Sequence, residues 1–155
     1  MKTEALIDMR APDDVVKNSD SLIELLGAQC SDLEKLLTLA REETLAAQEG
    51  RFLKIWEIVS ERASIGKRLE TFHQQIAELR GHLESKGESV NQYDITNRVV
   101  ELANQTLIQD QKTRLLLTES RDQAVVDLNQ VAQSNLGTNA YLRENTKGLA
   151  LNGSF

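Results

Sequence analysis

The stretch from Ile55 to Leu83 reads IWEIVSERASIGKRLETFHQQIAELRGHL and carries the strongest pattern in the chain. Nine positions follow one another in steps of three and four residues, and eight of them are apolar. These positions are Ile55, Ile58, Arg62, Ile65, Leu69, Phe72, Ile76, Leu79 and Leu83. Four heptads in phase are typical of a helix that packs lengthwise against other helices. The pattern therefore predicts a helix over 51–84 with one buried face.

The residues before this helix predict the partner for its buried face. Ser21 and Glu24 have the spacing of a capping box, which marks a helix start. Six apolar residues then recur at helical spacing: Leu22, Leu26, Leu33, Leu36, Leu37 and Ala40. Gly50 lies in the short break that follows. We expect a poorly ordered arm over 1–18, a helix over 19–48, and an antiparallel hairpin with the helix over 51–84.

A third helix is expected over 94–136, with Asp94 as its cap and Gly137 as its stop, followed by a flexible tail over 138–155. Aromatic residues make up only 4% of the chain and there is a single proline, which disfavours sandwiches and barrels. The sequence thus predicts an all-α fold. It is an up-down-up three-helix bundle that forms one domain over 1–155.

The third helix is too long for its neighbours. At 1.5 Å per residue it reaches ~65 Å against ~51 Å for the second, which leaves an overhang at about 124–136. Uncovered apolar side chains there imply a protein partner, a second copy of the chain, or a segment that orders on binding. A bend near Ser120 that folds the helix back is the alternative. The candidate partner-binding residues are Ala124, Val125, Leu128, Val131, Ala132 and Leu136, with Tyr141 and Leu142 in the tail.

Composition and charge exclude several classes of function. The net charge of −6 disfavours nucleic acid as a partner, because a phosphate-binding surface needs a basic stripe. The longest strictly apolar runs have three residues, so membrane insertion is not expected. Cys30 is the single cysteine and no secretory signal is evident, which favours the reducing cytoplasm.

Catalytic and metal chemistry find little support in the residues. Glu70 and His73 form half of a di-iron motif, but the second Glu-x-x-His pair is missing. His82 is followed by Lys86 at a spacing one residue too long for a phosphotransfer domain. We therefore expect no catalytic residue, metal ligand or cofactor, and no enzyme activity. Arg62 is expected to extend its charge to the edge of the seam, with pairing to a carboxylate of the first helix as the alternative.

A family resemblance adds a function to this layout. The chain resembles the FlgN-type flagellar export chaperones from about Ser21 onward. The likeness rests on Ala46-Ala47-Gln48-Glu49-Gly50-Arg51-Phe52, Glu61-Arg62, Leu69-Glu70, the Asn- and Gln-rich third helix, Tyr141, Gly148 and Gly153-Ser154-Phe155. The resemblance implies a cytoplasmic chaperone that binds the C-terminal helices of hook-associated proteins, prevents premature assembly, and contacts an export gate component. The alternative is a self-associating structural adaptor, such as a homodimer, without an export role.

Overall fold

The computed structural model describes residues 11–151, which form three helices. They are α1 (Ala11–Gln48), α2 (Phe52–Ser85) and α3 (Tyr93–Leu151), and they confirm the predicted all-α fold. The chain divides into two compact units, with the boundary between Thr113 and Arg114, inside α3. The first unit contains α1, α2 and the start of α3, and the second unit begins at Arg114.

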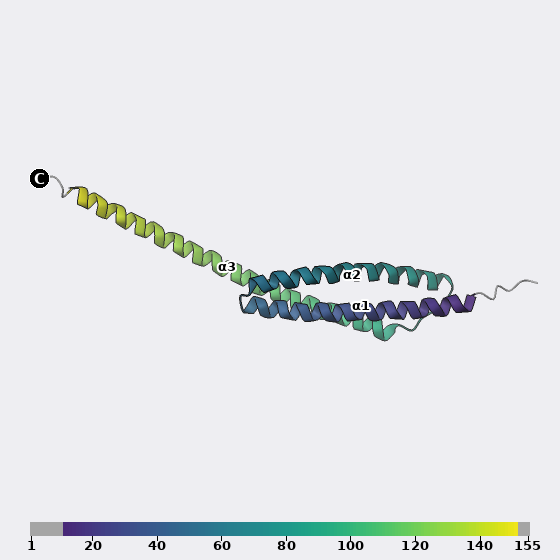
Figure 1. Ribbon diagram of the computed structural model, residues 1–155. Coiled ribbons are helices and arrows are strands. Elements are labelled where there is room, and N and C mark those ends of the chain that lie inside the picture. The colour runs from purple at the N-terminus through teal and green to yellow at the C-terminus, as the bar shows by residue number, and fades with distance from the viewer. Residues whose placement is uncertain (1–10, 152–155) are drawn as a thin grey trace, which may run out of the picture. The chain divides into compact units, whose positions relative to one another are not determined.

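The helices α1 and α2 lie side by side as the predicted antiparallel hairpin (Figure 1). Their connection is short because Gly50 adopts a positive φ of 68°, a conformation that disfavours side-chain-bearing residues. The amide of Arg51 donates to the carbonyl of Ala46 at 2.8 Å, and that of Gly50 to Ala47 at 3.3 Å. These two bonds form a Schellman motif, which ends α1 at the predicted position.

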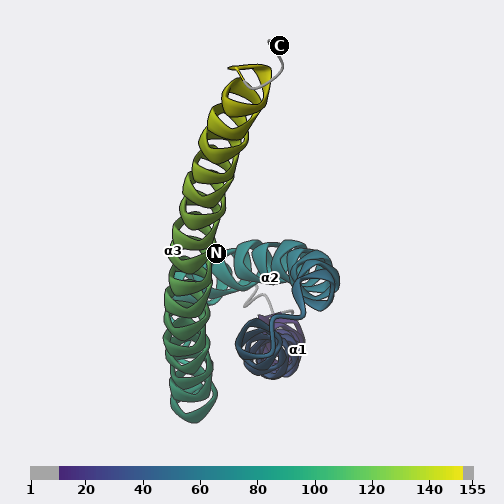
Figure 2. The same ribbon diagram turned by 90° about the vertical axis from the view of Figure 1, so that its left-hand side faces the viewer.

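The core of the first unit consists of three clusters along the hairpin. The cluster farthest from the short turn contains Leu22, Leu26, Ile76 and Leu83, the middle one Leu33, Leu37 and Leu102, and the last Leu39, Ile58 and Ile65. Figure 2 looks roughly along α1, with α2 beside it. Leu102 of α3 is 1% exposed between the hairpin's leucines. All eight apolar positions of the predicted seam are buried or partly buried, which confirms that prediction.

The predicted start of the first helix at residue 19 is wrong, because α1 already begins at Ala11. Residues 1–10 of the predicted arm lie outside the described part of the chain. Ser21 is not a cap: its hydroxyl donates to the carbonyl of Lys17 at 2.8 Å, inside the helix. Pro12 lies in the first turn of α1, where a proline is tolerated because the amide it lacks has no helical acceptor there.

The predicted end of the third helix at Leu136 is also wrong, because α3 continues to Leu151. The helix passes through Ser120 without a break and through Gly137 without a stop. Gly137 lacks the positive φ that Gly50 has at the end of α1. It therefore does not end α3 with a left-handed cap. Residues 138–151 are helical rather than a flexible tail, and 152–155 lie outside the described residues.

Candidate functional site

The predicted partner-binding residues lie on α3 in the second unit, and all of them are exposed. Val125, Leu128, Val131 and Leu136 expose between 51% and 70% of their surface. At about 100° per residue, six of the predicted residues fall on one face of the helix. They are Ala124, Val125, Leu128, Val131, Ala132 and Leu136, which we call the apolar face of α3. Exposed large apolar residues that share one face are typical of a binding surface.

The two predicted tail residues occupy different positions relative to the apolar face of α3. Both lie within the helix and are exposed, Tyr141 by 66% and Leu142 by 55%. On the same 100° step, Leu142 falls about 50° from the centre of the apolar face, while Tyr141 falls about 150° away. Leu142 therefore extends the face by between one and two further turns, and Tyr141 points to the opposite side of the helix.

The helix is uncharged over most of the length of this face, beyond Asp127. No charged residue occurs between Asp127 and Arg143. The opposite side carries amides and hydroxyls, including Gln130, Gln133 and Ser134, and all three are exposed. A partner would therefore meet apolar side chains bordered by neutral hydrogen-bonding groups, without a long-range charge to steer it.

A partly buried ion-pair network joins the three helices of the first unit. The Nη2 of Arg62 on α2 donates to both carboxylate oxygens of Asp110 on α3, at 2.7 and 2.8 Å. Its Nη1 donates to the carboxylate of Glu43 on α1. Burial opposes the charge of Arg62, but the hydrogen bonds to Glu43 and Asp110 outweigh it and raise the pKa of Arg62 above its ordinary value.

A pair of buried threonines lies beside this network. Thr44 on α1 donates its single hydroxyl proton to the carbonyl of Ala40 at 2.9 Å, which leaves the oxygen as an acceptor. The hydroxyl of Thr113 on α3 lies 2.8 Å from that oxygen, at hydrogen-bond distance. Together with Arg62, Glu43 and Asp110 these residues form what we call the polar layer. Directional bonds of this kind fix the register of α3 against the hairpin.

The expectation that Arg62 extends its charge to the seam edge is wrong, and the alternative of a carboxylate partner on α1 is correct. The sequence contained a signal for this pairing. Asp110 also falls at a seam position of its own helix, and two opposite charges on facing seams can satisfy one another. Glu43 and Thr44 were missed because the apolar pattern identified in the first helix ended at Ala40, although both positions continue its helical spacing.

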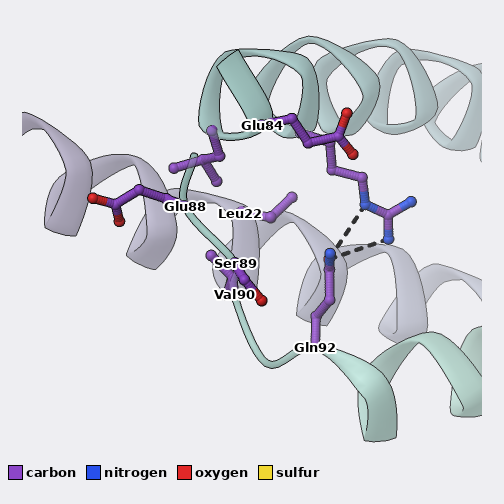
Figure 3. A pocket seen from close by; sticks show the side chains of 8 residues that line it. Leu22, Glu84, Glu88, Ser89, Val90 and Gln92 are labelled. Carbon is purple, nitrogen blue, oxygen red and sulfur yellow. Dashed lines mark hydrogen bonds between the residues drawn. The ribbon is translucent and has the colours of Figure 1, made fainter. Parts of the chain in front are cut away.

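A small pocket lies at the other end of the first unit, where the chain passes from α2 to α3 (Figure 3). Its lining includes Leu22, Leu83 and Val90, and Arg80 closes one side by donating to the amide oxygen of Gln92 at 3.1 and 3.3 Å. Its volume of about 220 Å³ is below the range of ~300–1,000 Å³ that is usual for small-molecule sites. The pocket is best explained as packing of the loop on the core.

Among the side chains that the structure describes, no group of three or more His, Cys, Asp or Glu is placed to hold a metal ion. None of the helices described has the length and apolar character that crossing a bilayer requires.

The chain matches no protein-family model, and neither a curated protein nor a solved structure is significantly similar to it.

Proposed function

We propose that this protein is a cytoplasmic flagellar export chaperone that acts by binding and not by catalysis. Its clients are the C-terminal helices of hook-associated proteins, which it keeps from assembling before delivering them to the export gate. The observation that supports the proposal is the exposed apolar face of α3. The family part of the proposal rests on the resemblance in the sequence, and neither nucleic acid nor membrane insertion has a part in it.

The binding mode is the packing of one amphipathic helix against another. A client helix that covers Leu128, Val131 and Leu136 removes from water side chains that are 56–70% exposed in the free protein. Each large apolar side chain that is fully buried contributes about 1.5–3 kcal/mol, so a few such contacts can stabilise the complex.

The neutral surroundings determine which client segment fits. With no charge between Asp127 and Arg143, the face offers no ion pair to a charged helix. Burying a charged client side chain there would cost several kcal/mol of desolvation with no compensation. The client helix is therefore expected to present an apolar stripe flanked by uncharged polar residues.

The test is binding of purified C-terminal segments of hook-associated proteins from the same cell, measured by calorimetry or co-purification. The variant Leu128→Asp/Val131→Asp places two carboxylates on the apolar face and is expected to weaken binding at least about a hundredfold. The matched control is Gln130→Asp/Gln133→Asp, which adds the same charges at the same spacing on the opposite side of α3. The proposal fails if both variants bind like the wild type or lose binding equally.

The structural-adaptor alternative uses the same face for a second copy of the chain. It predicts a tight oligomer of the pure protein that Leu128→Asp/Val131→Asp dissociates, and no complex with the hook-associated segments. The chaperone proposal predicts no tight oligomer through this face and a complex with the hook-associated segments.

A further inference from the structure

A second stripe runs along α2, outside the core. Phe52, Trp56, Val59, Ala63 and Gly66 follow one another in steps of four, three, four and three residues. All five are exposed, Phe52 by 58%, Trp56 by 75% and Val59 by 44%. The stripe lies about 100° around the helix from the core seam. Its heptad spacing is that of a helix face made to meet another helix.

The stripe carries the largest exposed aromatic surface of the hairpin. Trp56 is the single tryptophan of the chain, and it is three-quarters exposed rather than packed at the edge of the seam. Tryptophan is costly to leave in water and is enriched among the residues that dominate protein interfaces. An apolar stripe with two aromatics is thus a docking surface rather than ordinary solvated helix.

The order of side-chain sizes along the stripe indicates that a second copy of the chain covers it. The large residues Phe52 and Trp56 stand at one end, the small residues Ala63 and Gly66 at the other, and Val59 lies at the midpoint. An antiparallel copy of the same stripe therefore complements it, large against small, which is how two helix faces interdigitate. A two-fold axis requires such a self-complementary surface.

We propose that the protein forms a homodimer through this stripe, with the two α2 helices antiparallel and the two-fold axis at Val59. Phe52 packs against Gly66 of the partner subunit, Trp56 against Ala63 of the partner subunit, and the two Val59 side chains meet at the axis. The stripe spans ~21 Å at 1.5 Å per residue. It stops where Glu70 takes the next heptad position.

The local charges favour a second copy over a lipid surface. The basic residues next to the aromatics are already paired, Lys54 with Glu57 at 3.3 Å and Arg51 with Glu49. An anionic membrane attracts unpaired Lys and Arg beside apolar residues, and the chain as a whole carries a net charge of −6. Gly66 also has room on its outer side, since a Cβ added there would have no neighbour within 4 Å.

This dimer goes beyond the proposed chaperone function and does not depend on it. The interface uses α2 alone and shares no residue with the apolar face of α3. One face per subunit is a small interface, and the dimer is expected to dissociate on dilution.

The geometry is tested by cysteine cross-linking of the full-length chain in a Cys30→Ser background. Val59→Cys should form a disulfide-linked dimer under mild oxidation, because both copies present this position at the axis. Ala63→Cys lies on the same stripe but ~12 Å from its counterpart along the antiparallel pair, and it should not cross-link. Ser64→Cys, exposed on another side of α2, should not cross-link either. Equal cross-linking of Ala63→Cys and Val59→Cys, or none by Val59→Cys, would overturn the proposal.

The affinity is tested by sedimentation equilibrium of the full-length protein. Gly66→Leu should weaken the dimer at least about tenfold through a clash with Phe52 of the partner subunit, while the open space around Gly66 leaves each subunit folded. Trp56→Ala should weaken it by a similar factor, whereas Tyr93→Ala, an equally exposed aromatic off the stripe, should not. A monomer at every concentration, or a dimer unchanged by both stripe variants, refutes the proposal. A dimer lost instead in Leu128→Asp/Val131→Asp would refute it too and would support the adaptor.

Discussion

Replacing Arg62 with methionine isolates the contribution of the polar layer to stability. Methionine keeps most of the arginine stem and its packing between the helices. The substitution removes the guanidinium and, with it, the bonds to Glu43 and Asp110. Two carboxylates of like charge then remain on facing helices without a cation between them.

The cost depends on how far each abandoned group can return to water. The side chain of Glu43 is 9% exposed and that of Asp110 is 38% exposed, so Glu43 bears most of the penalty. Breaking a fully buried pair costs about 3–5 kcal/mol. Because Arg62 is itself 18% exposed and Asp110 reaches solvent, we expect Arg62→Met to cost about 2–3 kcal/mol. Asp110→Asn, which leaves the Glu43 pair intact, should cost about 1 kcal/mol or less.

Urea unfolding followed by circular dichroism measures these differences. The decisive comparison is the triple variant Glu43→Leu/Arg62→Met/Asp110→Leu, in which no charge is left unpaired. It should recover most of the loss, because an apolar replacement of a buried ion network is often neutral or stabilising. Arg121→Met is the control, since Arg121 is 71% exposed and its pair with Asp122 should contribute little. A single variant that costs less than about 0.5 kcal/mol, or a triple variant as unstable as the single, would refute the reasoning.

Three further predictions concern other positions. The hydrogen bond from Arg68 holds the pKa of Asp32 below its ordinary 3.8 despite burial. The pair therefore stabilises the fold at pH values above 3.8, and this contribution is lost as the pH falls below 3.8. Below pH 3.8 the urea midpoint of the wild type should decline more steeply than that of Asp32→Asn. Burial, followed by the charge of Glu34, raises the pKa of the Cys30 thiol, so iodoacetamide at pH 8 should alkylate it several-fold more slowly than in the urea-unfolded chain, and equal rates would contradict this. Gly137→Ala should protect the amides around it from hydrogen exchange by up to about 1 kcal/mol, because Gly137 lies inside a helix with open space beside it; unchanged or faster exchange would contradict the helical assignment.

The seam of α2 could be predicted because its information is local. Residues such as Ile58, Ile65 and Ile76 are spaced by the period of one helix, and that spacing already says which side is buried. The end of α1 before Gly50 could also be predicted, since a Schellman motif needs only the glycine and the turn before it. The hairpin follows from these two features without knowledge of the tertiary structure.

Helix ends were predicted less well because the same residue types occur inside helices and at their ends. Ser21 has capping-box spacing, yet its hydroxyl bonds back to Lys17 within α1. Gly137 is a helix terminator only if it adopts a positive φ, and nothing in the local sequence decides that. Where Ser or Gly is surrounded by helix-forming residues, propagation of the helix outweighs the weak local signal.

The pairing of Arg62 was beyond the local sequence for a different reason. Glu43 precedes it by 19 residues and Asp110 follows it by 48. Their meeting depends on the register of three helices, which is set by the packing of the apolar clusters. The sequence showed two charges at seam positions, but an arginine stem can also reach the edge of a helix pair. Only the three-dimensional arrangement distinguishes these outcomes.

Two parts of α3 have different physical properties. In the first unit its inward positions change from apolar, at Val99 and Leu102, to polar at Asp110 and Thr113. A hydrogen bond or ion pair is satisfied in one register only, so this part of α3 is specified against sliding along the hairpin. The apolar face of α3 has no charged residue over 128–142, and dispersion contacts tolerate many partner geometries. The proposed function requires a protein that holds its own helices in one arrangement and also binds other helices, and a polar layer followed by an exposed apolar face supplies these two properties in that order.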